Sequence, residues 1–263
     1  MNVIPLTPLD LSLCAFLVIL LAASSARLKL GIHKQLIVSA FRCTIQLLLV
    51  GLVLEFLFAS QEFIWLAIMA TIMLLVAGHA VCARQQRPLR GWWMYGIGTL
   101  SMCISSFTVT CFALQIIINT SPWYTPQYAI PLLGMLLGNT MNGIAISIDR
   151  LTQSAWQQRT VIEQRLALGQ TRSVALSSIT KDSMRSGMIP IINSMATTGI
   201  VSLPGMMTGQ ILGGSLPMDA VKYQILILFL IAAGTGFGVI AAVQLTGRRL
   251  FDERQRLRLD RYK

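Results

Sequence analysis

The sequence predicts an all-α membrane protein with about seven transmembrane helices, its N-terminus outside and its C-terminus in the cytoplasm. Of its 263 residues, 54% are hydrophobic and only 12% are charged, and its mean hydropathy of +0.67 is too high for a soluble domain. A helix needs about 20 mostly apolar residues to cross a hydrocarbon core about 30 Å thick. Segments of this kind occur at residues 8–26, 36–58, 63–82, 92–118, 128–148, 187–212 and 220–246.

The positions of the basic residues predict the orientation of these helices. The net charge is +11, and nearly all of the 21 Lys and Arg residues fall at residues 27–34, 84–90, 149–186 and 247–263. With seven spans, these four stretches share one side of the membrane, which the positive-inside rule makes cytoplasmic. The charge therefore indicates a surface that contacts membrane lipid, and it argues against nucleic acid as a partner.

The apolar segments leave no room for a separate soluble domain. We therefore expect a single transmembrane domain over residues 1–263, with a cytoplasmic loop at 149–186 and a basic cytoplasmic tail at 247–263. The N-terminus lacks the basic region of a cleavable signal, so we expect the first span to stay as an anchor. The five cysteines show no C-x-x-C spacing, which argues against disulfides and zinc.

The polar loop at 149–186 predicts a bent helical hairpin. Good helix formers dominate 152–168, Gly169 is a natural left-handed stop, and Thr171 can cap a second helix. The spacing Glu163, Gly169, Ile179 matches part of the E-A-A-x-x-x-G-x(9)-I-x-L-P loop by which ABC importer permeases contact their ATPase, although the alanines and the terminal L-P are absent. The alternative is an amphipathic loop that lies on the anionic leaflet.

The chain has no phosphate-binding loop of its own. No G-x-x-x-x-G-K-[ST] occurs in it. We therefore expect the chain not to be an enzyme and to carry no cofactor, so that any ATP and Mg would belong to a partner ATPase subunit.

Glycines spaced by four residues mark the fifth and sixth spans. G-x-x-x-G repeats place small residues on one helix face, where another backbone can approach closely. These repeats predict helix packing at Gly134, Gly138, Gly205, Gly209 and Gly213.

Pro204 predicts a break in the sixth span, because proline removes a helical hydrogen bond at a cost of about 3 kcal/mol. Broken helices at membrane depth are found where the freed backbone faces protein or a water-filled cavity, and transporters use them for substrate sites. The residues that we expect along such a pathway are amides and thioethers of the fifth and sixth spans, together with the proline at the break. They are Asn139, Asn142, Asn193, Pro204, Met206 and Met207.

Methionines in the same two spans leave a metal role open. Thioethers prefer soft ions such as Cu(I), whereas ferrous iron prefers imidazole or oxygen ligands. Met is also a flexible filler of helix interfaces, which is the simpler interpretation. The metal ligands are therefore unknown at this point.

Six motifs carry a resemblance to a known family. They are R-x-x-x-Q-L at 42–47, I-P-x-x-G-M-x-x-G-N-x-M at 130–141, E-x-x-L-x-L-G at 163–169, D-S-x-R at 182–185, G-x-V-S-L-P-G-M-M-x-G at 199–209 and K-Y-Q-I at 222–225. In these motifs the chain resembles the FetB-type permeases, the membrane subunits of a bacterial iron-export ABC transporter. The resemblance runs from about residue 36 to residue 230.

The resemblance implies a multi-pass permease of the bacterial inner membrane, present as a homodimer and paired with two copies of an ABC ATPase. It favours ATPase coupling through Glu163, Gly169 and Ile179 over adsorption to the lipid surface. The implied activity is export of iron or another metal ion. Plant relatives are associated with nucleotide sugars, so a non-metal cargo is one alternative. A membrane scaffold or sensor without transport activity, and an ion-coupled transporter, are the others.

Overall fold

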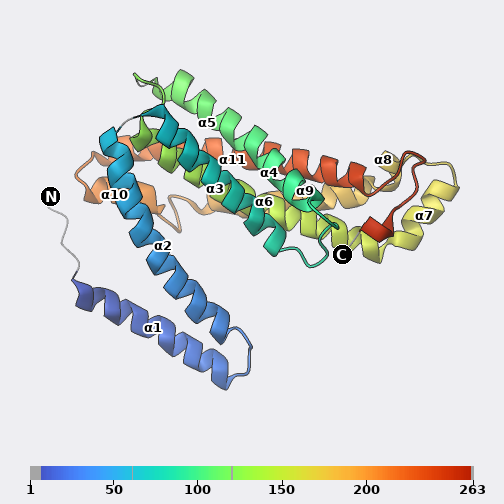
Figure 1. Cartoon of the computed structure of the whole chain (residues 1–263), viewed down its shortest axis with the longest axis horizontal. Coiled ribbons are helices and arrows are strands. Elements are labelled where there is room, and N and C mark those ends of the chain that lie inside the picture. The colour runs from blue at the N-terminus through green and yellow to red at the C-terminus, as the bar shows by residue number, and fades with distance from the viewer. Residues whose placement is uncertain (1–6, 61, 120, 262–263) are drawn as a thin grey trace.

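The computed structural model describes residues 7–60, 62–119 and 121–261. Its helices (Figure 1) are α1 Pro8–Arg27, α2 His33–Ser60, α3 Phe63–Ala83, α4 Trp93–Met102, η1 Cys103–Phe107, α5 Thr108–Phe112, η2 Ala113–Ile118, α6 Pro126–Gln157, α7 Arg159–Ala167, α8 Arg172–Ala175, α9 Ser177–Thr197, α10 Gly205–Leu212, α11 Pro217–Arg249 and η3 Leu259–Arg261. The all-α prediction is confirmed.

In the described part of the chain, six helices are long and apolar enough to cross a membrane, whereas the sequence predicts seven. Six predicted spans match α1, α2, α3, the continuous stretch Trp93–Ile118, α6 and α11. The segment 187–212 differs: α9 ends at Thr197, and α10 begins only at Gly205. Pro204 caps α10, so the chain is interrupted where the proline predicts a break.

α9 nevertheless connects the two ends of the bundle. The Cζ atom of Arg87 lies 4.4 Å from the ring centroid of Trp156, and that of Arg249 lies 3.9 Å from the ring centroid of Trp93. The ends of α6 and α11 therefore both lie beside the α3–α4 connection, so the chain between them must cross to the opposite end and return. The 21 residues of α9 extend about 31 Å at 1.5 Å per residue, enough for that crossing.

The loops at one end of the bundle gather three of the four basic stretches. We call this the basic end; it contains residues 84–92, 150–176 and 248–261. The backbone N–H of Arg90 donates to the carbonyl of Arg261 at 2.7 Å, and the N–H of Arg172 donates to Gln255 Oε1 at 2.9 Å. These three stretches share one side, as the sequence predicts, while their assignment to the cytoplasm stays a prediction.

The core lies between α3, α4, α6, α9 and α11, and small residues allow the closest contacts. A Cβ added to Gly187 of α9 would lie 2.6 Å from the carbonyl oxygen of Gly143 of α6. A Cβ added to Gly238 of α11 would lie 2.6 Å from Cγ2 of Thr140. Only glycine fits these positions, so the helix backbones meet there almost directly.

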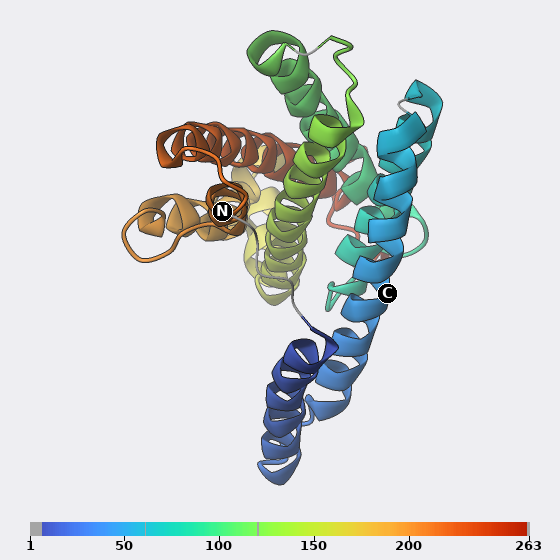
Figure 2. The same cartoon turned by 90° about the vertical axis from the view of Figure 1, so that its left-hand side faces the viewer.

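The α1–α2 hairpin stands apart from this core (Figure 2). Leu57 is the only α2 residue that is buried among those described, and α1 buries only Ala22 and Ser25. Figure 2 places α2 and α10 on opposite sides of α6. The hairpin therefore presents its apolar side chains outward.

Candidate functional site

The interruption between α9 and α10 is a tight turn with exposed side chains. Gly199 has a left-handed backbone, with φ of +86°, and its N–H donates to the carbonyl of Ser202 at 2.9 Å. The carbonyl of Thr197 accepts from the N–H of Val201 at 3.0 Å, which closes the end of α9. The apolar side chains of the turn point outward, with Ile200 88% exposed. The turn therefore offers exposed backbone and apolar side chains outside the helical core.

The three predicted amide side chains lie on exposed surfaces of α6 and α9. Asn139 donates to the carbonyl of Met135 in its own helix at 2.8 Å. Asn142 accepts a hydrogen bond from the Arg84 guanidinium. Asn193 lies on the exposed face of α9. The structure therefore links Asn142 to a basic side chain from the α3–α4 connection, which the sequence alone does not indicate.

Asn142 lies close to the basic end. The next residues of that connection also bind α6: Gln85 donates to the carbonyl of Ala145 at 3.1 Å, and the N–H of Gln86 donates to Asp149 Oδ1 at 2.9 Å. The part of α6 beyond Asp149 therefore extends past the end of α3.

The predicted glycine packing differs from the observed packing. Gly134 meets a neighbouring helix, since an added Cβ would lie 3.2 Å from Cε of Met73. Cβ atoms added to Gly138, Gly205 and Gly209 would have no neighbour within 4 Å, and one added to Gly213 would meet only backbone of α10 itself. Within one chain these four positions do not join helices, and a role in contacts with a second copy stays a prediction.

The fifth and sixth predicted spans do meet, but through Gly143 and Gly187. Neither glycine belongs to a G-x-x-x-G repeat with the predicted positions, so spacing gave no signal for them. Gly234 and Gly238 of α11 form such a repeat in the sequence GTGFG, which sequence reasoning missed.

Buried hydroxyls accompany these glycines. Ser101, Ser106, Thr140 and Thr235 are at most 2% exposed, and their hydroxyl oxygens have no hydrogen-bond partner among the residues that the structure describes. Added Cβ atoms at Gly238 and Gly143 would touch Thr140 and Thr235 respectively, so both threonines lie at the glycine contacts. Polar groups of this kind sit at helix interfaces in membranes, where neutral oxygens can also face a passing solute.

The two predicted methionines lie in different environments. Met206 of α10 packs against a cluster of buried side chains that also contacts Met135. Met207 is partly exposed on α10. In the described ranges, no three His, Cys, Asp or Glu side chains lie close enough to hold a metal ion. The thioethers are thus placed as side chains that pack or line a surface.

Within the predicted loop at 149–186, only α7, a turn and α8 form a helical hairpin, because residues 149–157 continue α6 and residues 177–186 begin α9. Gly169 has φ of +83°, the left-handed conformation expected of a helix stop. Glu163 and Gly169 are exposed, whereas Ile179 is only 3% exposed and belongs to the main core. Ile162 and Ala175 are each 1% exposed, and they attach the hairpin to that core. The hairpin thus has an exposed tip and a buried base.

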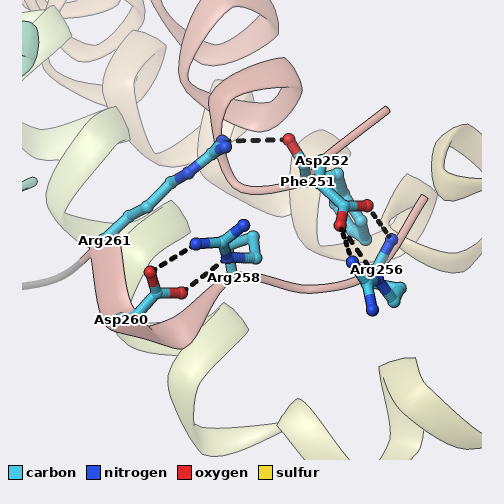
Figure 3. A network of polar contacts seen from close by, with 6 residues as sticks. All are labelled: Phe251, Asp252, Arg256, Arg258, Asp260 and Arg261. Carbon is cyan, nitrogen blue, oxygen red and sulfur yellow. Dashed lines mark hydrogen bonds and ion pairs between the residues drawn. The ribbon is translucent and has the colours of Figure 1, made fainter. Parts of the chain in front are cut away.

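The C-terminal tail, residues 250–261, contacts this hairpin where the N–H of Arg172 donates to Gln255 Oε1, a contact that sequence reasoning missed. Figure 3 shows the polar contacts within the tail. Leu250 and Phe251 are buried in the main core, and Arg261 donates to the carbonyl of Phe251 at 3.0 Å. Arg256 forms an ion pair with Asp252 at 2.9 Å. A groove of about 750 Å3 lies between the tail and the hairpin turn, and both Glu163 and Gly169 line it.

A second ion pair stabilises the end of the tail. Both carboxylate oxygens of Asp260 accept hydrogen bonds from Arg258, each at 2.7 Å. These hydrogen bonds lower the pKa of the Asp260 carboxyl to about 2. The backbone N–H of Arg256 donates a hydrogen bond to the Asp252 carboxylate and lowers the pKa of that carboxyl. Both carboxylates therefore stay ionised at neutral pH.

These features define a polytopic helical membrane protein with a packed helical core, a broken helix at its side and a helical hairpin at its basic end. The chain belongs to the Uncharacterised protein family (UPF0014), whose profile matches residues 8–251. The predicted resemblance to FetB-type permeases is thereby confirmed. The family and the apolar helices make the chain a multi-pass membrane protein, consistent with the bacterial inner membrane.

Three relatives show the range of this family. The chain is 38% identical over 245 residues to UPF0014 membrane protein slr1647 of Synechocystis sp., which covers 90% of this chain and 92% of the relative. It is 30% identical over 262 residues to the probable iron export permease protein FetB of Escherichia coli, covering 98% and 97%. It is 31% identical over 244 residues to Protein ALUMINUM SENSITIVE 3 of Arabidopsis thaliana, covering 92% and 87%. No solved structure matches the chain.

Proposed function

We propose that the chain is the membrane-spanning permease subunit of an ABC transporter that exports iron or another metal ion, with ATP hydrolysed by a separate subunit. The observation that carries this proposal is the α7–α8 hairpin: its tip is exposed, while Ile162, Ala175 and Ile179 fix its base in the core. A partner that moves the tip would therefore move α6 and α9 with it. Glu163 and Gly169 are the proposed contacts on the tip.

The choice of a metal cargo rests on the relative named a probable iron export permease. The chain's own contribution would be neutral oxygens, from the buried hydroxyls of Thr140 and Thr235 and from the amide of Asn139, since the Asn142 oxygen is already engaged by the Arg84 guanidinium. Hard and borderline cations accept oxygen ligands. The backbone exposed between α9 and α10 would supply further carbonyl oxygens next to Pro204.

A homodimer is part of the proposal. Gly138, Gly205 and Gly209 have open space around them in one chain, and small residues of this kind suit close packing against another helix. A second permease copy would cover these positions, and two ATPase copies would contact the two hairpins.

The first test is purification in a mild detergent, followed by mass spectrometry of the proteins that co-purify. We expect a protein with a phosphate-binding loop in stoichiometric amount, and loss of that protein in Glu163→Lys. Glu62→Lys is the matched control, because it makes the same charge change at an exposed position outside the hairpin. A folded wild-type permease without such a partner would contradict the proposal and favour a scaffold.

The second test uses the recovered complex and asks which cargo stimulates ATP hydrolysis. We expect ferrous iron or another divalent metal ion to stimulate it, and a nucleotide sugar to have no effect. The reverse result would leave the ABC permease intact but replace the cargo.

A further inference from the structure

A cavity of about 920 Å3 lies at the basic end, away from both the hairpin groove and the α9–α10 turn. Its walls come from the α3–α4 connection, the first turns of α4, the end of α11 and the C-terminal tail. The cavity thus joins two membrane-spanning helices to a tail that lies beyond them.

One wall of this cavity, the basic wall, carries an excess of positive charge. Its ionisable side chains are Arg90, Arg249, Arg258, Arg261 and Asp260. Asp260 is already engaged by both hydrogen bonds from Arg258, and Arg261 donates to backbone carbonyls. In the described residues, no ion pair involves Arg90 or Arg249. A guanidinium has five N–H donors, so these two arginines keep donors for an anion.

The other wall of the cavity is apolar and partly exposed. Ile97 and Leu100 of α4 face Leu245 of α11 across the cavity, and Leu100 is 51% exposed. Trp92 and Trp93 stand at the boundary between the two walls, and Trp92 is 83% exposed. Tryptophan concentrates at the level of lipid headgroups, which places the arginines at the depth of lipid phosphates.

We propose that this cavity binds one anionic phospholipid, of the phosphatidylglycerol or cardiolipin class, with its phosphate on Arg90 and Arg249 and an acyl chain along Ile97, Leu100 and Leu245. Basic pockets between membrane helices bind such headgroups. A soluble phosphate would satisfy the arginines but leave the apolar wall uncovered, and a zwitterionic lipid would bring its own cation into a basic cluster. The lipid would link α4, α11 and the tail. This site is independent of the proposed transport function.

The test is native mass spectrometry of the purified protein titrated with dioleoylphosphatidylglycerol, cardiolipin or dioleoylphosphatidylcholine. We expect one anionic lipid to be retained in preference to phosphatidylcholine. The double variant Arg90→Gln, Arg249→Gln should weaken its binding about thirtyfold, from two surface arginine contacts. The double variant Arg150→Gln, Arg185→Gln is the control, since it removes the same charge from exposed positions outside the cavity.

Equal retention of phosphatidylcholine, or equal affinity in the two double variants, would overturn the proposal. Displacement of the anionic lipid by millimolar inorganic phosphate would also overturn it, because the site would then take free phosphate. A second measurement needs no arginine variant. Dibrominated phosphatidylglycerol should quench tryptophan fluorescence more than dibrominated phosphatidylcholine, and this excess should vanish in Trp92→Phe, Trp93→Phe. No excess quenching would contradict the site even if the arginine variant fails to fold.

Discussion

α2 and α6 are both long and apolar, yet they have opposite surroundings. The most apolar window of α2 has a mean hydropathy of 2.1 and none of it is buried, whereas that of α6 has a mean hydropathy of 1.4 and 56% of it is buried. The more apolar helix is thus the less buried one. In a bilayer, apolar side chains gain nothing by leaving lipid for protein, so burial follows small and polar residues that pack closely. Hydropathy therefore detects spans but does not detect the core.

The largest contrast should appear when an apolar side chain is truncated in each helix. Ile148→Ala in α6 removes a side chain that is fully buried and should cost about 2–5 kcal/mol of unfolding free energy. Leu48→Ala in α2 removes one that is 68% exposed and should change stability by less than about 0.5 kcal/mol. Thermal unfolding in detergent measures both. Equal losses would mean that the α1–α2 hairpin is packed in the purified protein, by a second copy or a partner.

A backbone change should separate the two regions by function. Gly169 and Gly31 both have left-handed backbones, with φ of +83° and +75°. Gly169→Pro also removes the N–H that donates to the carbonyl of Leu166. Because a misplaced proline costs about 3 kcal/mol, the hairpin turn should be distorted. We expect transport to be lost while membrane insertion is kept. Gly31→Pro lies in the α1–α2 connection and should retain transport. Cargo flux in proteoliposomes decides, and wild-type flux in Gly169→Pro would rule out coupling through the hairpin.

Adding a single methyl group should give effects of opposite sign. Gly187→Ala places a Cβ 2.6 Å from the carbonyl oxygen of Gly143, so it should destabilise the protein by about 1–3 kcal/mol. Gly51→Ala in α2 meets no atom within 4 Å, so it should stabilise the helix by up to about 1 kcal/mol. Melting temperatures of the two variants test this directly. A stabilising Gly187→Ala would show that α6 and α9 can separate without cost.

These contrasts explain how much of the structure could be predicted. Runs of about 20 apolar residues suffice to locate six spans, because a bilayer sets that length. α9 escapes this rule, since Lys181, Asp182 and Arg185 lie within it and its packing partners are set by α6 and α11. Pro204 lies at the break, as predicted, but Pro131 and Pro190 lie inside continuous helices, so proline alone does not decide where a span is interrupted.

The contacts of the site were less predictable. G-x-x-x-G spacing selects Gly205 and Gly209, but which glycine meets a neighbour depends on how whole helices pack, and the actual contact is between Gly143 and Gly187. The folded tail gives no periodic signal at all, because residues distant in the sequence, such as Arg90 and Arg261, hold it in place.

The smallest expected effect concerns this tail, where exposed ion pairs contribute to its attachment to the packed region. The pKa of Asp260 is lowered from 3.8 to about 2 by Arg258. Because the folded-state pKa is the lower one, the contact stabilises the tail above about pH 4, and this stabilisation is lost as the pH falls through about 2. Pepsin should therefore cut at the buried Phe251 more readily at pH 2 than at pH 4, relative to cutting at the exposed Leu203.

Asp260→Asn should remove this pH dependence. We expect it to raise the relative cutting rate at Phe251 roughly two- to fivefold at pH 4, the modest effect of a surface ion pair, with no further rise toward pH 2. Asp219→Asn is the matched control, because Asp219 pairs with Lys222 at 3.2 Å at the start of α11. It should leave cutting at Phe251 unchanged. If Asp260→Asn behaves like this control, then the buried side chains of Leu250 and Phe251 hold the tail in place without the ion pair. The attachment of the tail to the core would then rest on burial of apolar side chains and not on its exposed charges.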